Sequence, residues 1–164
     1  MMTILRNLGL VLLAIPLLAC SPQAADQAPA ASTAANSAAL SEAGLEIIPV
    51  TITTESGTYV IQTEVASTRE EQARGMMFRT EMGPDEGMLF PYDVPQDMGF
   101  WMRNTLLPLD IIFIDENQTV INIGDGVPYN EESVRSDRPG IAVLELIGGR
   151  SAELGIEPGD RIEW

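Results

Sequence analysis

Short β-type runs separated by turn residues make up most of the chain from residue 45 to its end. IPVTITTESGTYVIQTEV holds two such runs around Glu55-Ser56-Gly57, a pattern typical of a β-hairpin. Further strands are expected over residues 87–90, 99–103, 110–114, 119–123 and 141–147. Many short strands with Gly and Pro turns predict a mainly β (α+β) fold: a small barrel-like or rolled, mostly antiparallel sheet with one or two short helices.

Local signals refine this expectation at the first strand and at the helices. Pro49 lacks an N–H, so the first run should start late or lie at a sheet edge. Ser67-Thr68-Arg69-Glu70 matches a capping box and should open a helix that runs to about Met76. A second short helix is expected over about residues 149–154, before a final strand.

Residues 1–19 have the pattern of a signal peptide. Arg6 supplies a thin positive region, and the apolar run from Leu8 to Ala19 is too short for a bilayer, which needs roughly 20 apolar residues. The run ends in LLAC, which resembles the lipobox of bacterial lipoproteins, in which the Cys is acylated and becomes the N-terminus. Cys20 is the only Cys of the chain and is therefore the predicted lipidation site.

Residues 20–44 are expected to form the lipidated Cys and a disordered tether rich in Ala, Ser and Pro. The domain of residues 45–164 would then be exported and held at the periplasmic face of a membrane. Because Ser21 rather than Asp follows Cys20, the resemblance favours the outer membrane. The membrane is expected to be contacted through this anchor only.

The composition excludes several classes of site. The chain has no His and one Cys, which rules out Cys/His zinc sites, Ser-His-Asp triads and a disulfide framework. Its 9 basic residues are outnumbered by 24 acids, for a net charge of −15, and such a charge argues against nucleic acid as a partner. No cofactor, no metal ligand set and no catalytic residue are predicted.

Three segments carry a family resemblance. They are Gly75-Met76-Met77-Phe78-Arg79, Gly87-Met88-Leu89-Phe90, and Phe100-Trp101-Met102-Arg103-Asn104-Thr105 followed by PLDIIFI. Together with Val143-Leu144-Glu145-Leu146 and the later Gly155 and Gly159-Asp160, they resemble the DUF192 family of bacterial and archaeal proteins. Arg103 stands where the family usually has Lys. The resemblance implies a compact β-rich fold, often exported, and brings no established reaction, ligand or cofactor.

Two carboxylates are embedded in strands that are apolar on both faces. Asp110 opens the run DIIFI, and Glu145 lies between Leu144 and Leu146. Because a lone buried charge costs several kcal/mol, each should have a partner, and Arg79 and Arg103 are the expected partners. These residues either fix strand register as internal ion pairs or line a pocket. In the second interpretation Trp101 is a stacking wall, and the ligand-binding residues are Arg79, Trp101, Arg103, Asn104, Asp110 and Glu145.

The functional prediction is an exported, lipid-anchored domain that acts as a non-catalytic binding or accessory module for an envelope protein or a small-molecule ligand. One alternative is a small periplasmic enzyme that uses Asp110 and Glu145 as an acid/base pair. Another is a Cu(I)-binding protein, because thioethers are soft ligands and several Met residues stand beside Phe or Trp, among them Met98 and Met102.

Overall fold

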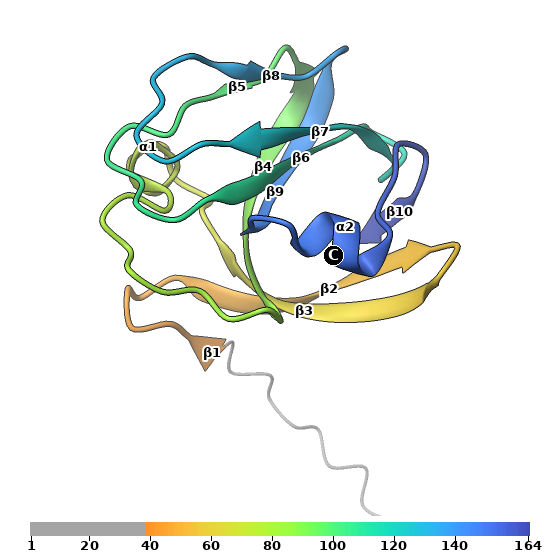
Figure 1. The fold of residues 1–164 in the computed structure, drawn as a ribbon, viewed down its shortest axis with the longest axis horizontal. Helices are drawn as coiled ribbons and strands as arrows, with labels where there is room; N and C mark the ends of the chain where they lie inside the picture. Colours follow the sequence, from red (N-terminus) through yellow and green to blue (C-terminus); the bar gives the residue numbers. More distant parts are fainter. Residues whose placement is uncertain (1–38) are drawn as a thin grey trace, which may run out of the picture. The chain divides into compact units, whose positions relative to one another are not determined.

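The computed structural model describes residues 39–164. Its ten strands and two helices follow one another along the chain (Figure 1). The strands are β1 Ala39–Leu40, β2 Glu46–Thr54, β3 Gly57–Val65, β4 Glu86–Gln96, β5 Gly99–Phe100, β6 Leu109–Ile114, β7 Val120–Gly126, β8 Val134–Arg135, β9 Gly140–Ile147 and β10 Arg161–Glu163. The helices are α1 Arg69–Arg74 and α2 Arg150–Leu154.

Eight of the strands form one curled sheet. Its order is β1-β2-β3-β4-β9-β6-β7, with β10 on the outer side of β2. Among the described strand pairs only β3 and β4 run parallel. The sheet stays open, but an isolated bridge between Thr119 and Arg161 brings its two ends together. A mainly β, rolled and mostly antiparallel sheet with two short helices is the predicted fold class, which is confirmed.

The first hairpin forms as predicted, with β2 paired to β3 along its whole length. Pro49 lies inside β2, so the expectation of a late start is wrong, because β2 already begins at Glu46. The outer side of β2 pairs with β1 at residues 46–47 and with β10 at residues 51–53. Pro49 falls in the gap between them. There its missing N–H removes no hydrogen bond from either of these short ladders.

The two faces of the central strands bury different kinds of side chain. One face packs a core of Ile, Leu and Val, here called the aliphatic core: Val50, Ile52, Ile61, Leu89, Ile112, Ile114, Val120, Ala142, Leu144, Leu146, Leu154, Ile156 and Ile162. The opposite face packs the methionine core: Ala66, Met76, Met88, Phe90, Met98, Met102, Leu109, Ile111, Phe113, Ile121 and Val143, with Met82, Tyr92 and Phe100 partly buried against them.

Helix α1 begins one residue later than predicted. Its N-cap is Thr68, whose side chain accepts a hydrogen bond from the Glu71 N–H, while the Glu71 carboxylate accepts one from the Thr68 N–H. The capping box therefore ends at Glu71 rather than Glu70. Because two Glu residues follow one another, the sequence pattern fits a capping box at either position. Gly75 ends the helix at φ +46°, and a Cβ there would meet the Phe90 ring at 3.3 Å. This close approach brings the segment after α1 onto the methionine core.

The remaining segments differ from expectation mainly in length. The predicted strand over 99–103 is only β5, which pairs with β8 in the segment between β7 and β9. Ala39 and Leu40, within the range assigned to the tether, form β1 on the edge of β2. In the described part of the chain, neither helix has the length or apolarity needed to cross a membrane. The predicted signal peptide and Cys20 lie outside the described residues.

Candidate functional site: an open groove over the methionine core

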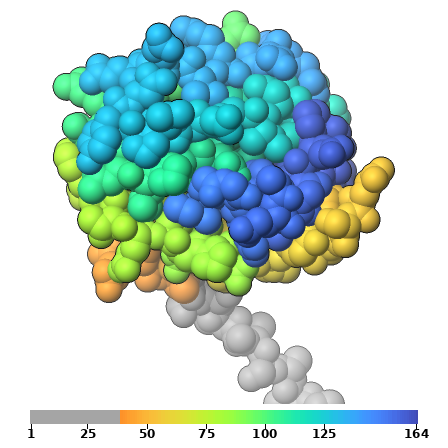
Figure 2. Space-filling view, viewed as in Figure 1, coloured from red at the N-terminus to blue at the C-terminus, as the bar shows by residue number. Residues whose placement is uncertain are grey.

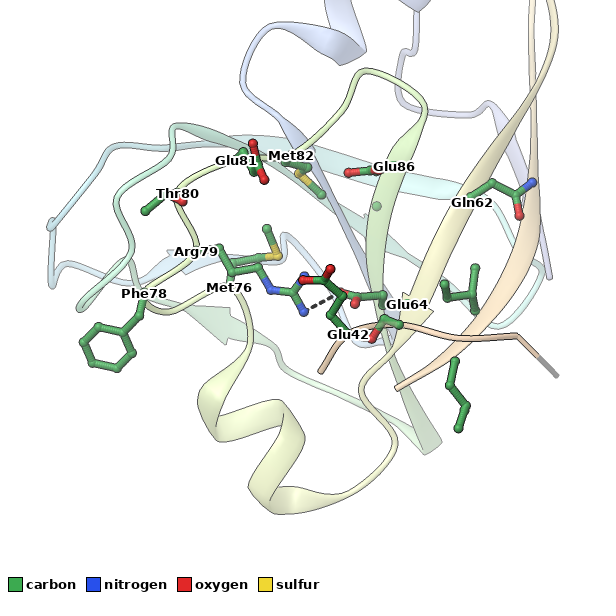
Figure 3. A pocket seen from close by; sticks show the side chains of 14 residues that line it. Glu42, Gln62, Glu64, Met76, Phe78, Arg79, Thr80, Glu81, Met82 and Glu86 are labelled. Carbon is green, nitrogen blue, oxygen red and sulfur yellow. Dashed lines mark ion pairs between the residues drawn. The ribbon is translucent and has the colours of Figure 1, made fainter. Parts of the chain in front are cut away.

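A groove of about 620 Å³ opens between β1 and the segment that follows α1. Figure 2 shows the first described residues, in orange, next to the yellow-green segment that supplies the other wall. Apolar side chains and carboxylates both line it (Figure 3): Leu40, Ile47, Met76, Phe78 and Met82 with Glu42, Glu64, Glu81 and Glu86. Phe78 and Arg79 also border a neighbouring hollow of about 350 Å³. The groove therefore offers both apolar surface and negative charge.

Arg79 lies inside this groove and forms an ion pair with Glu64, with Nη2 and Oε2 2.5 Å apart (Figure 3). The Glu64 side chain is only 12% exposed and that of Arg79 30% exposed. Arg79 was expected to pair with Asp110 or Glu145, but its partner in the structure is Glu64. Glu64 was not foreseen because it alternates with apolar residues in β3, as a solvent-facing residue does.

Trp101, Arg103 and Asn104 belong to a loop beside the groove. The Arg103 guanidinium stacks over the Trp101 ring at 5.6 Å, and both side chains are exposed. Asn104 has a positive φ of 54°, and its carbonyl accepts a hydrogen bond from the N–H of Phe78, which itself has φ 66°. Positive φ in non-glycine residues is uncommon and costs about 1–3 kcal/mol, so it marks segments held by their surroundings. The loop thus fixes the exposed Phe78 at the groove rim.

Asp110 is buried, and each of its carboxylate oxygens has a backbone partner. Its two carboxylate oxygens accept hydrogen bonds from the N–H groups of Gly149 at 2.9 Å and Ser151 at 2.6 Å. Asp110 lies beside Leu146 in the sheet, on the face that carries the aliphatic core. It therefore holds the start of α2 against β6, and no arginine among residues 39–164 pairs with it.

Glu145 is buried with no partner at all for one of its oxygens. The residue is 4% exposed, and its Oε2 atom has no hydrogen-bond partner within residues 39–164. Burial raises the pKa of this carboxyl to about 8. Burial, and secondarily the charge of Glu145, also raises the pKa of the Tyr92 hydroxyl. At neutral pH the Glu145 side chain is therefore largely the uncharged acid.

The sheet separates the two carboxylates that the enzyme hypothesis combined. Ile111 pairs with Glu145 and Asp110 with Leu146, so Asp110 and Glu145 project from opposite faces. Glu145 shares the face of the methionine core, over which the segment bearing Arg79 also packs. Within residues 39–164 no group of three or more carboxylates is arranged to hold a metal ion. Met98 and Met102 are both buried in the methionine core.

The fold and the groove define a small curled β-sheet domain with a ligand-sized opening on one face. The chain belongs to the DUF192 family, whose model, described as an uncharacterised ACR, matches residues 50–164. A comparison with curated proteins found no match.

The solved structures that are similar to this chain include the following two. One is a protein of unknown function from Novosphingobium aromaticivorans DSM 12444, with 49% identity, a TM-score of 0.76, and coverage of 79% of this chain and 94% of that one. The other, from Sinorhizobium meliloti 1021, is named as a candidate transcription regulator. It has 38% identity, a TM-score of 0.70, and coverage of 73% of this chain and 94% of that one.

Proposed function

We propose that this protein is an exported, lipid-anchored binding module of the cell envelope, without catalytic activity of its own, that receives its ligand or partner in the Arg79 groove. The observation that carries the proposal is the open groove itself, in which a largely buried Arg79–Glu64 pair lies among apolar side chains. Ligand sites combine such apolar surface with a few placed polar groups.

The carboxylates inside the fold support a binding role over acid/base chemistry. A general acid and base must both reach one substrate, and Asp110 and Glu145 project from opposite faces of the sheet. Asp110 accepts hydrogen bonds from two backbone N–H groups and is not among the residues that line the groove, so a substrate in the groove would not meet it. The groove is also accessible without unfolding any strand.

The net charge of the chain bears on the partner. The described domain contributes most of the 24 acidic residues, and four glutamates line the groove. A field of this sign steers cationic partners and repels polyanions. For this reason we do not extend the transcription role named for the Sinorhizobium protein to this chain.

Site-specific crosslinking in cells tests the binding role. A photoreactive amino acid placed at Phe78, 64% exposed at the groove rim, should give a discrete covalent adduct on irradiation. The matched control is Val60, which is 52% exposed on β3 and does not line the groove. Equal labelling from both positions, or none from Phe78, would contradict the proposal.

Anchoring is tested separately from binding. A palmitate analogue fed to cells should label the chain, and Cys20→Ala should abolish the label and release the protein into the soluble periplasm. Labelling that persists after Cys20→Ala would remove the lipoprotein part of the proposal and leave the groove untouched.

A further inference from the structure

We infer that the protein binds an organic cation with an aliphatic stem, a primary ammonium of the lysine or alkylamine type, that enters through the groove, displaces the side chains of Met76 and Met82, and pairs its charged end with Glu145. The inference rests on the proposed function, because the Arg79 groove is its entrance. It adds the chemical class of the ligand and a residue that takes no part in the groove lining.

Glu145 and the groove are connected by one row of side chains across the sheet. Glu64 on β3 pairs with Met88 on β4, and Met88 pairs with Glu145 on β9. Residues directly opposite one another project from the same face, and neighbouring strands lie about 4.8 Å apart. The backbone of Glu145 is therefore about 10 Å from that of Glu64 in the groove, with one methionine between them.

One oxygen of the Glu145 carboxylate is not used by the described part of the fold. Oε2 makes no hydrogen bond, and the neighbours of Glu145 across the sheet are Met88 and Ile111. A buried polar group without a partner destabilises the folded state, and such violations are expected at functional sites. A cationic ligand would supply the missing partner.

The side chains between Glu145 and the groove suit an aliphatic stem. Met76 and Met82 line the groove and pack into the methionine core with Met88. Met is unbranched and adapts its shape to its neighbours, so this wall can move aside without breaking backbone hydrogen bonds. A lysine-type stem of four carbons is flexible and carries a compact charge at its end.

Charges at the entrance favour the same class of ligand. Glu42 and Glu81 are exposed at the groove, and Arg79, the cation among its lining residues, is already paired with Glu64. An incoming ammonium therefore meets net negative charge at the mouth and an acceptor at the inner end. The same carboxylates would repel an anionic ligand.

Binding of a cation at Glu145 must be coupled to release of its proton. The groups facing Glu145 are Tyr92 on β4, the Glu64–Arg79 pair beyond Met88, and apolar residues of β6. Because the carboxyl is protonated below a pKa of about 8, it must ionise to pair with an ammonium. The affinity should rise about tenfold per pH unit between pH 6 and 7.5.

The test is titration of the whole chain, in nonionic detergent, with n-butylamine and with n-butanol as the uncharged probe. Methionine methyl groups labelled with carbon-13 report the site by NMR. Butylamine should shift the signals of Met76, Met82 and Met88 saturably, while butanol should not. Met98, beside Gly140 at the other end of β9, is the internal control and should not move.

Glu145→Gln should weaken butylamine binding at least tenfold and remove its pH dependence, and Glu116→Gln, on an exposed turn, should change neither. Glu145→Met serves as a second variant with an apolar side chain suited to the core. Unchanged affinity in either Glu145 variant would overturn the inference. A Phe78 crosslink without butylamine binding would overturn it while leaving the proposed function in place. Absence of both would remove the two together.

Discussion

Asp110 and Glu145 stand almost side by side in the central strands, yet the sheet gives them opposite fates. Asp110 faces the aliphatic core and accepts two backbone hydrogen bonds. Glu145 faces the methionine core, and its Oε2 has no partner. Two carboxylates with equal burial can thus be a structural clamp in one case and an unsatisfied group in the other. Burial alone therefore does not identify a functional acid, whereas the census of its hydrogen-bond partners does.

The cores around the two carboxylates also differ in the kinds of side chain that they contain. The aliphatic core contains no methionine and no phenylalanine among its buried residues. The methionine core holds most of the methionines of the domain and a chain of edge-to-face rings, with Phe90, Phe100 and Phe113 at centroid distances of 4.9 and 6.3 Å. Branched aliphatic residues specify one packing, while methionine adapts to several. The groove lies over the adaptable side.

The largest effect is expected at Asp110. Asp110→Ala leaves the buried N–H of Ser151 and the partly buried N–H of Gly149 without their acceptor, and we expect it to lower the free energy of unfolding by about 3–5 kcal/mol. Urea denaturation of the whole chain measures this. Asp125→Ala is the matched control, since Asp125 is opposite Asp110 in the sheet but exposed. A loss below about 1 kcal/mol for Asp110→Ala would show that the hydrogen bonds of Asp110 do not stabilise the fold, and Asp110 would then not differ from Glu145 in this respect.

Glu145→Gln should act in the opposite direction and only at higher pH. The folded-state pKa of about 8 lies above the ordinary value of 4.5, so the protonated acid favours folding below pH 4.5. This contribution is lost as the pH rises toward 8, by up to about 1.4 kcal/mol per pH unit. The variant should therefore gain about 2–4 kcal/mol over the wild type between pH 4.5 and 8. Urea midpoints across this range check it, and parallel curves for the two proteins would refute it.

Thr68→Ala tests whether the N-cap of α1 stabilises the helix that precedes the segment packed on the methionine core. The substitution removes the cap that Thr68 provides to the Glu71 N–H, and helix caps of this kind contribute about 1 kcal/mol. We expect a loss of that size in thermal unfolding. Thr68→Ser keeps the hydroxyl and should retain most of the stability. If Thr68→Ser lost as much as Thr68→Ala, the cap would not be the cause.

Arg103→Ala should have the smallest effect. Arg103 is exposed and stacks on Trp101, a contact that contributes about 0.5–1 kcal/mol at exposed sites. We expect Arg103→Ala to lower the free energy of unfolding by an amount within that range, as measured by urea denaturation. Arg103→Lys keeps the positive charge and should cause a smaller loss. A loss of several kcal/mol would mean that Arg103 neutralises a buried acid. It would contradict the partners described above for Asp110 and Glu145.

The sequence predicted the strands better than it predicted the hydrogen-bond and ion-pair partners of the buried charged residues. Alternation and turn residues place the hairpin of β2 and β3, and the doubly apolar runs identify Asp110 and Glu145 as buried. Neither carboxylate, however, meets the expected arginine. The partner of Asp110 is backbone N–H at Gly149 and Ser151, and a backbone donor has no signature in the residue type. The pairing of Arg79 with Glu64 depends on the path of the chain after α1, which Gly75 sets through its positive φ.

The way in which the chain enters the domain has a mechanical consequence. Ala39 and Leu40 are held to β2 by a pairing of only two residues, while β2 and β3 are joined along nine. A pull applied at Ala39 would load this short pairing first and peel it away before the main hairpin bears any force. Leu40, Ser41 and Glu42, which follow directly, form one wall of the groove. Tension on the N-terminal side would therefore widen the groove while the rest of the sheet stays intact.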